Sequence, residues 1–404
     1  MKIMWGLAAL AALLGPGPVA ASDADDLSRL LRDNSWKVET SATGLSGPGA
    51  ARIVAWSREA QFFLLGENHG SAGIARFATG VAKALGPVGF RHTVVEADPL
   101  VTDHMVRLLK QGGMPAFANW LATDQRQRAV PFFAWREEAD FAVAALANGP
   151  VWGVDQSFLA AAHVHLDAIA AQTRDRSART MAQAMAAEAR ADVIGWLAKV
   201  DRARIVALRD AIPARDAAAR RIADLLVQSA VIYSPFSGGQ GSWHRANLER
   251  ETLMKRSFLG YYDAAAKRGG PPPRVLFKFG AWHLQRGLSE TNVPSLGNFL
   301  AELALARYDR PVFNLRVMCG PGAEQVTFDG SVQSCADEFA PLAPALGAAL
   351  SPEGATVFDL RPLRDKPRLW RDWPAEAKRL VWTYDAVVVI RGGGAATFIA
   401  PPPK

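Results

Sequence analysis

The sequence has few cysteines and lacks the short motifs that identify several common classes of hydrolase. Only two cysteines occur in 404 residues, and their spacing matches no zinc-binding motif. The chain contains no G-x-S-x-G elbow, and Ser71 lacks that context, which argues against a serine nucleophile of the α/β-hydrolase kind. It contains no H-E-x-x-H pair either, so no local motif decides for a catalytic metal.

Long hydrophobic runs and blocks of basic residues are also missing. Outside the N-terminus, no apolar segment approaches the roughly 20 residues that a transmembrane helix needs. The formal charge of +7 comes from 46 Lys and Arg against 39 Asp and Glu, and the basic residues are scattered instead of interleaved with aromatics. We therefore expect no nucleic-acid partner and no stable membrane anchor. With 50% hydrophobic and 21% charged residues, the chain can bury a large core.

The first residues have the pattern of a secretory signal. The segment has one Lys, an apolar stretch of about a dozen residues, a Gly/Pro break and small residues before Ser22. This pattern predicts a signal peptide over residues 1–21, and no cysteine lies beside it to carry a lipid anchor. We expect an exported, soluble protein of the periplasm or the extracellular space.

Export changes what the two cysteines indicate. Cys319 and Cys335 are close in sequence, and in an oxidising compartment such a pair forms a disulfide. Closing the 319–335 loop contributes about 3 kcal/mol to the free energy of unfolding in the chain-entropy model.

Apolar runs of strand length alternate with helical periodicity along the chain. Runs at 61–67 and 91–96 enclose a segment with helix-spaced apolar residues from Ile74 to Leu85, which predicts a β-α-β unit. Such continuous apolar runs suit strands buried on both faces, so we expect an α/β fold with a mainly parallel sheet covered by helices. Further runs lie at 149–157, 274–283, 311–318 and 384–392.

The composition changes within this pattern at about 159–232. Ala, Arg, Asp and Met dominate there, and Gly and Pro are almost absent. We therefore expect one α/β domain over 22–404 that carries a helical insertion at about 159–232.

Polar residues follow the first four apolar runs at the points where the strands should end. In a parallel sheet the carboxyl ends of the strands meet at one edge, where ligands bind. Four strands that end in ionisable or amide groups therefore predict a polar site with a hydrophobic floor. These residues are Glu67 and His69, then Glu96 and Asp98, then Asp155 and Gln156, and finally His283.

Structural roles compete with this interpretation for single residues. A lone histidine at a strand end is often a hydrogen-bonded structural residue, and Asp98 before Pro99 has the pattern of a helix N-cap. Glu96 is harder to explain in this way, since a glutamate is rarely buried without a partner. Aromatic residues near the expected site either fill the core or line a cleft for a large apolar substrate. They are Phe132, Phe133, Trp135, Trp152, Trp243 and Trp282, with His244 beside one of them.

Four short stretches stand out at these positions: "LLGENHG", "VVEADP", "RETLM" at 250–254, and "KFGAWHL" followed by "NVPSLGNFL". They resemble motifs of the erythromycin esterase group. That group belongs to a superfamily that also contains the haem-binding ChaN lipoproteins and the TIKI/TraB metalloproteases. The esterases usually carry two residues between the Glu and the His of the first motif, whereas here only Asn68 separates Glu67 from His69, which is closer to the ChaN-like spacing.

The resemblance implies a hydrolase that cleaves an ester, lactone or amide bond of a small molecule. His69 would be the general base that activates water and Glu96 its carboxylate partner. Arg250 and His283 would bind or polarise the reacting carbonyl, and Glu67 completes the candidate catalytic residues. The expected substrate-binding residues are Asn68, Asp155, Gln156, Trp135, Trp282 and His244.

Two alternatives use the same residues. In a metal-dependent hydrolase, a divalent ion would be held by Glu67, His69, Glu96 and His283 and would acidify a bound water. In a haem or small-ligand binding protein that resembles ChaN, the site would hold its ligand without turnover. The sequence names no cofactor that is certain, and it leaves the natural substrate and the oligomeric state open.

Overall fold

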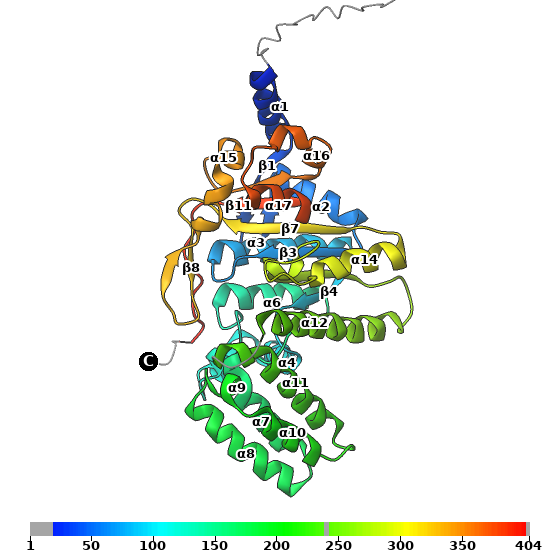
Figure 1. Cartoon of the computed structure of the whole chain (residues 1–404), viewed down its shortest axis with the longest axis vertical. Coiled ribbons are helices and arrows are strands. Elements are labelled where there is room, and N and C mark those ends of the chain that lie inside the picture. The colour runs from blue at the N-terminus through cyan, green and yellow to red at the C-terminus, as the bar shows by residue number, and fades with distance from the viewer. Residues whose placement is uncertain (1–18, 238–241, 401–404) are drawn as a thin grey trace, which may run out of the picture.

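The computed structural model describes residues 19–237 and 242–400 (Figure 1). Residues 1–18 of the expected signal peptide lie outside the described residues. Among the helices that are described, none combines the length and the hydrophobicity that crossing a membrane requires.

A twisted nine-stranded sheet runs through the described chain. The described chain has these strands: β1 (Ser35–Ser41), β2 (Gly44–Ser46), β3 (Phe62–Glu67), β4 (Phe90–Val95), β5 (Val151–Gly153), β6 (Arg274–Gly280), β7 (Val312–Cys319), β8 (Glu324–Val326), β9 (Val332–Ser334), β10 (Ala355–Asp359) and β11 (Ala386–Ile390). The sheet has the order β2-β1-β10-β11-β7-β3-β6-β4-β5, while β8 and β9 form a separate hairpin. From β11 to β5 every neighbouring pair is parallel. The expected mainly parallel α/β fold is therefore confirmed.

The central strand β3 explains why the sheet needs helices on both sides. All six of its residues are buried, and successive side chains point to opposite faces. Phe63 and Leu65 enter one hydrophobic core, whereas Phe62 and Leu64 enter another. A continuous apolar run is therefore required here, since neither face of the strand meets water.

Helices cover both faces of the sheet. The helices of the described chain are α1 (Val19–Asp33), α2 (Pro48–Glu59), α3 (Ala72–Leu85), α4 (Pro99–Leu121), α5 (Arg126–Ala129), α6 (Arg136–Asn148), α7 (Ala162–Gln172), α8 (Arg176–Ala191), α9 (Trp196–Lys199), α10 (Arg202–Ala211), α11 (Ala217–Tyr233), α12 (Trp243–Ala266), α13 (Ala281–Leu284), α14 (Leu296–Tyr308), α15 (Ala343–Leu346), α16 (Arg361–Arg364) and α17 (Ala375–Thr383). Phe77 of α3 and Phe141 of α6 pack against one face, and Phe258 of α12 and Leu300 of α14 against the other.

The helices α7 to α11 form a body of their own at one end of the molecule (Figure 1). Their apolar faces share a core that includes Leu166, Met185, Leu208 and Leu226 and that is separate from the cores on the sheet. This body follows β5 in the chain and leads into α12, so it lies beyond the sheet edge where β4 and β5 run.

The β8–β9 hairpin is fastened to the carboxyl edge of the sheet. A disulfide joins Cys319 at the end of β7 to Cys335 just after β9, with the Cα atoms 5.6 Å apart. The carbonyl oxygen of Gly70 accepts hydrogen bonds from the backbone of Val326 in β8 and of Ala396 in the C-terminal segment. Gly70 has φ +85°, and a Cβ there would lie 2.2 Å from the carbonyl oxygen of Val326, so the "GENHG" motif needs its last glycine.

Two features of the sheet differ from the sequence-based expectation. β3, α3 and β4 have the expected order with parallel strands, but β6 is inserted between β3 and β4. The sheet also continues past β11 through β10, β1 and β2, where neighbouring strands are antiparallel. These edge strands carry mixed polar and apolar residues, so they lack the continuous apolar runs that identify the central strands.

Candidate active site

The predicted site residues come from strands that are neighbours in the sheet. β3, β6, β4 and β5 lie side by side and point the same way, so their carboxyl ends form one edge. Glu67 ends β3, Glu96 follows β4, and Asp155 follows β5. His283 lies in the short helix α13 that begins directly after β6. The parallel arrangement thus brings residues about 200 positions apart in sequence to a common edge.

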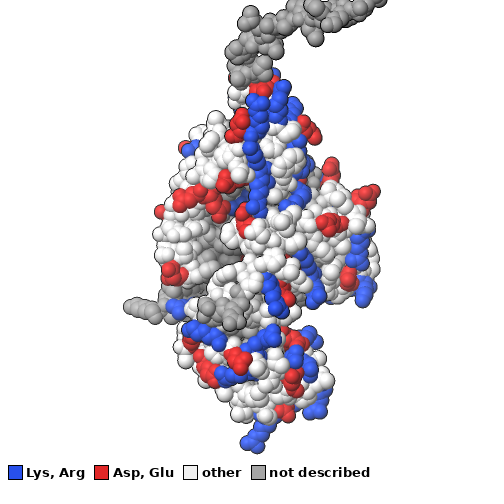
Figure 2. All heavy atoms as spheres, viewed as in Figure 1, with Lys and Arg blue, Asp and Glu red and all other residues white. Residues whose placement is uncertain are grey.

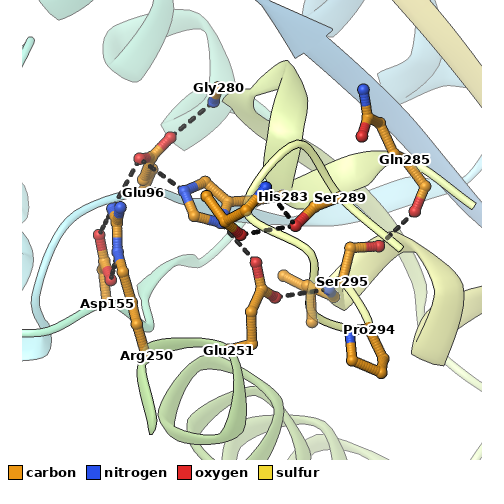
Figure 3. A network of polar contacts seen from close by, with 12 residues as sticks. Glu96, Asp155, Arg250, Glu251, Gly280, His283, Gln285, Ser289, Pro294 and Ser295 are labelled. Atoms are coloured by element: carbon orange, nitrogen blue, oxygen red, sulfur yellow. Dashed lines mark hydrogen bonds and ion pairs between the residues drawn. The ribbon is translucent and has the colours of Figure 1, made fainter. Parts of the chain in front are cut away.

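Glu96 is the centre of this cluster (Figure 3). Its Oε1 atom accepts a hydrogen bond from Arg250 Nη2 at 2.8 Å and lies 3.5 Å from His283 Nε2. Its Oε2 atom accepts from the backbone N–H of Gly280 at 2.6 Å and lies 3.3 Å from His69 Nε2. Burial alone would raise the pKa of Glu96, but the charges of His283, His69 and Arg250 outweigh burial and hold it well below its usual value. Glu96 is therefore a fixed negative charge between two imidazoles.

His69 lies between two carboxylates. Its Nδ1 atom is 3.1 Å from Glu67 Oε1, opposite the contact of Nε2 with Glu96. Burial lowers the pKa of His69, but the hydrogen bonds and charges of Glu67 and Glu96 outweigh it and raise the pKa to about 9. The side chain is 25% exposed, so a ligand in the adjoining pocket can reach the ring. In the free protein His69 is therefore an imidazolium at neutral pH.

Phe132 covers one face of the His69 ring. The two rings stack with centroids 3.7 Å apart and an interplanar angle of 18°. Phe132 has φ +63°, which is unusual for a bulky residue and costs about 1–3 kcal/mol where it occurs. The strained backbone holds the phenyl ring against the imidazole, so the orientation of His69 is set by two carboxylates and one aromatic face.

A buried ammonium group supports Glu67 from inside the fold. Lys278 of β6 donates to Glu67 Oε1 at 2.5 Å and to Glu138 Oε2 at 2.6 Å, and all three side chains are almost fully buried. Burial and the charge of Glu67 raise the pKa of Glu138 to about 7, although Lys278 opposes this shift. Burial alone would raise the pKa of Glu67, but the contacts with Lys278 and His69 outweigh burial and lower the pKa below its usual value. Lys278 thus keeps Glu67 ionised beside His69.

His283 is held by a carboxylate of its own. Its Nδ1 atom lies 2.7 Å from Glu251 Oε1, and Glu251 Oε2 accepts from the backbone N–H of Leu296 at 2.6 Å. A carboxylate can only accept, so Nδ1 carries a hydrogen and Nε2 is directed toward Glu96. The carboxylate and imidazole form a pair of the kind that orients a catalytic histidine.

Arg250 reaches the cluster from α12. Its Nε atom donates to Gln156 Oε1 at 2.8 Å and to Asp155 Oδ1 at 3.1 Å, and its Nη2 atom donates to Asp155 Oδ2 at 2.6 Å as well as to Glu96. Burial lowers the pKa of Arg250, but Asp155 and Glu96 raise it well above its usual value. The guanidinium is therefore a permanent cation in one fixed orientation.

A pocket of about 390 Å³ opens over these groups. Figure 2 shows a hollow in this face of the molecule, on the side where Figure 1 labels β8. Val326, Thr327 and Phe328 of the hairpin line the pocket opposite the strand ends. Among the predicted residues, the pocket wall contains Glu67, Asn68, His69, Glu96, Trp135, Arg250, Trp282 and His283.

Three residues expected to bind substrate do not line this pocket. Asp155 and Gln156 lie behind Arg250, and their polar atoms are used to hold its guanidinium. They therefore position Arg250 in this structure, and their part in binding a substrate stays a prediction. His244 lies near the start of α12 and is exposed to solvent outside the pocket wall. Proximity to Trp243 in sequence gave no information about which way the helix would direct it.

A divalent metal does not fit these residues as they are arranged. Among the described residues, no group of three or more His, Cys, Asp and Glu side chains is placed to hold a metal ion. Lys278 lies at Glu67 and Arg250 at Glu96, so cationic side chains take the places that a metal would take. Haem fits no better, because an axial histidine presents a ring nitrogen to iron, whereas both nitrogens of His69 and of His283 face carboxylates.

Several residues of the cluster were not predicted from the sequence. Lys278 gave a usable signal, since a lysine inside the apolar run "RVLFKFG" requires a buried partner. Glu138 gave none, because it lies in a helix whose charged residues look like a solvated face. Glu251 lies within the motif "RETLM", but the motif assigned it no role. Arg316, which donates to Asn68 Oδ1 at 2.6 Å and lines the pocket, lies in a strand that ends far from the motifs in sequence.

Comparison with known proteins agrees with this architecture. No protein-family model matches the sequence, and no curated protein matches it. A solved structure of a succinoglycan biosynthesis protein is 12% identical, with a TM-score of 0.60 over 93% of this chain and 99% of that chain. A protein from Bacillus cereus is also 12% identical, with a TM-score of 0.62 over 93% and 99% of the two chains.

The third similar structure is a mutant of the erythromycin esterase EreC in its open conformation. It is 13% identical, with a TM-score of 0.60 over 90% of this chain and 98% of that chain. Identity this low establishes a shared fold and leaves the chemistry to the residues of this chain. The protein therefore has the fold of erythromycin esterase, as the resemblance of its motifs predicts.

Proposed function

We propose that this protein is a hydrolase that cleaves an ester, lactone or amide bond of a small molecule with an activated water. The observation that carries the proposal is the sharing of one carboxylate, Glu96, by two imidazoles, His69 and His283, with Arg250 beside them in one pocket. Such a group provides a base, a charge that stabilises its protonated form, and donors for a developing oxyanion.

His69 is the proposed general base. The water oxygen attacks the carbonyl carbon, and its proton passes to His69 Nε2, the ring nitrogen with the longer contact to a carboxylate. The bond from the carbonyl carbon to the alcohol oxygen or amine nitrogen then breaks, and the same proton passes to that leaving atom. Glu67 and Glu96 stabilise the imidazolium that this transfer forms, which lowers the barrier. The same carboxylates hold a proton on His69 in the free protein, since its pKa is about 9. Only about one molecule in a hundred then has neutral His69 at pH 7, so the rate should increase in alkaline solution.

Arg250 and His283 are the proposed oxyanion donors. The contacts of Arg250 with Glu96, Asp155 and Gln156 use Nε and Nη2, and the guanidinium lines the pocket, so Nη1 is the atom that a carbonyl oxygen would meet. His283 completes the arrangement as an imidazolium, because Glu251 holds the Nδ1 hydrogen and Nε2, which faces Glu96 at the pocket wall, donates only when it is protonated as well. Permanent charge at Arg250 favours the oxyanion more than a neutral donor would.

The similar fold of EreC, which is named as an erythromycin esterase, supports an ester or lactone as the reacting group. We also propose that the protein is exported. The disulfide between Cys319 and Cys335 supports this, because such bonds persist in oxidising compartments. Fractionation of cells followed by N-terminal sequencing would test it, and a full-length chain found in the cytosol would contradict it.

A screen of esters, lactones and amides with the purified protein tests the activity. For a substrate that is turned over, we expect His69→Ala to lower kcat/KM by about 10²- to 10⁴-fold, and Glu96→Gln to lower it as well. Activity should be the same with and without a chelator.

His104→Ala is a matched control, because this histidine lies on the α4 surface beside Arg107. Circular dichroism and thermal unfolding would show that each variant is folded. Turnover that survives in both His69→Ala and Glu96→Gln would overturn the proposed mechanism.

A further inference from the structure

A second compartment lies beside the candidate active site. It has a volume of about 430 Å³ and is lined mainly by apolar residues from the loop before α6, the segment after β5, the helical body and the hairpin tip. Val130, Ala134, Phe158 and Ile194 lie in its wall without lining the first pocket. The compartment is therefore an apolar hollow with its own walls.

An aromatic partition separates the two hollows and belongs to both. Trp135 and Phe328 line each of them, and their rings stack with centroids 5.6 Å apart. Phe132 lines the apolar compartment and stacks on His69, so one side of its ring borders the reacting group. A group that extends from a carbonyl near His69 past these rings would enter the apolar compartment directly.

Two apolar side chains at this compartment remain exposed. Phe328 is 52% exposed at the hairpin tip, and Ile194 is 51% exposed on the helical body across from it. Single exposed apolar residues are common. Here two of them flank one apolar hollow, so apolar surface contacts water on both sides of its opening. A hydrocarbon group in the compartment would remove both side chains from water.

The opposite side of the candidate active site has a different character. There Trp282, Arg316 and Glu338 border a further hollow of about 430 Å³ whose wall contains Glu290 and Arg379. A polar part of a substrate would find several charged partners on that side. On the aromatic side, Arg128 and Asp329 are the charged residues of a wall that is otherwise mainly apolar. The two sides therefore distinguish the ends of an amphiphilic molecule.

We propose that the substrate is an amphiphilic ester whose apolar hydrocarbon group occupies the compartment between Ala134, Phe158, Ile194 and Phe328. This proposal rests on the proposed hydrolase function and adds the class of substrate. The hydrocarbon group belongs either to the acyl part or to the alcohol part of the ester. In both cases the compartment would bind it by burying its apolar surface.

Two series of esters test the proposal with the full-length protein. One series lengthens the acyl chain from acetate to octanoate on a fixed chromogenic alcohol, and the other lengthens an alkyl alcohol on fixed acetate. In one of them, kcat/KM should rise by roughly three- to fourfold for each methylene that is buried. The series that responds identifies which side of the bond faces the compartment.

Two variants should remove this dependence on chain length. Ala134→Phe fills the compartment, and Ile194→Ser makes its exposed rim polar without disturbing the core. We expect the ratio of kcat/KM for the octyl or octanoyl ester to kcat/KM for the acetate to fall at least tenfold in each variant. Leu305→Ser is the matched control, because Leu305 is 58% exposed on α14, outside these hollows.

A binding measurement separates failure of this inference from failure of the hydrolase proposal. Bromododecanoic acid should quench tryptophan fluorescence through Trp135 in the wild type, and Ala134→Phe should abolish the quenching. Quenching without turnover of any ester would overturn the hydrolase proposal and leave the compartment in place. A wild type that shows neither a chain-length effect nor quenching, or variants that keep both, would overturn the compartment proposal.

Discussion

His283 donates its Nδ1 hydrogen to Glu251 over 2.7 Å, and this bond determines which ring nitrogen faces the pocket. Glu251 is 2% exposed and does not line the pocket, so it acts only through His283 and the backbone of Leu296. A carboxylate accepts from both groups at once. An amide at this position has one accepting oxygen and therefore cannot serve both donors.

We therefore expect Glu251→Gln to lower kcat by about 10²- to 10⁴-fold with little change in KM. Steady-state kinetics on any substrate found in the screen would measure the two constants separately. Glu302→Gln serves as the control, because Glu302 is an exposed residue of α14 that accepts only from Asn298 among the described contacts. A loss that appears entirely in KM would show that Glu251 shapes the binding surface and does not orient His283.

The raised pKa of His69 predicts an alkaline activity profile. If neutral His69 is the base, log kcat/KM should increase by about one per pH unit and level off near pH 9, where the ring has lost its proton. The measurement is kcat/KM between pH 6 and 10.5, with the pKa of His69 followed by NMR and assigned with His69→Ala. An activity that falls through pH 9 would instead make the imidazolium the active form, as a proton donor.

The same shift affects stability. The pKa of His69 is raised above its ordinary value of 6.5 in the folded state, so the imidazolium stabilises the fold fully below pH 6.5. This contribution is lost as the pH rises from 6.5 through about 9. His69→Gln should therefore destabilise the protein more at pH 6 than at pH 10, as measured by urea unfolding. An equal effect at both pH values would show that the folded protein does not favour the charged ring.

The fold and much of this site could be predicted because both depend on short patterns. Continuous apolar runs identify strands buried on both faces, and the residues that follow parallel strands share one edge. His69 and Glu96 were found in this way. Arg250 came from the motif resemblance alone, since nothing in its own helix shows which residue faces the sheet.

The remaining contacts depend on long-range geometry that a linear pattern does not contain. Lys278 meets Glu67 because β6 lies beside β3, whereas the order of the strands along the chain predicts β4 as the neighbour of β3. Its second partner, Glu138, comes from α6. Asp155 was expected at the ligand because it follows a strand. Its carboxylate instead accepts from Arg250, because the helix α12 places the guanidinium at the end of that strand.

Gly280 provides a steric test of the cluster. A Cβ at this position would lie 2.8 Å from His69 Nε2 and 3.2 Å from Glu96 Oε2, closer than these atoms can tolerate. Gly280→Ala should therefore displace the imidazole and lower kcat/KM by about 10²-fold or more, since catalysis is sensitive to shifts of about 1 Å. Gly260→Ala is the control, because a Cβ there meets no atom within 4 Å. Unchanged activity in Gly280→Ala would contradict the role of the His69 and Glu96 contact.

Lys278 should be essential for stability as well as for the charge beside His69. Its ammonium group lies between Glu67 and Glu138 with all three side chains buried, so Lys278→Met leaves Glu138 without a cation and Glu67 with His69 alone. Removing one partner of a buried ion pair costs about 3–5 kcal/mol of the free energy of unfolding. Glu138 already has a pKa of about 7, so the variant can relieve the repulsion by taking up a proton there. The loss should be smaller at pH 5 than at pH 8.

Urea unfolding of the single and double variants would measure this coupling. Lys278→Met combined with Glu138→Gln should regain part of the loss, because the second change removes the charge that the first leaves unpaired. Lys255→Met is the control, since Lys255 lies on the exposed side of α12 and donates only to the carbonyl of Pro294 in the described structure. A Lys278→Met variant as stable as this control would mean that Glu67 is neutral in the folded protein. The charge beside His69 would then be absent, and the alkaline activity profile predicted above would shift toward neutral pH.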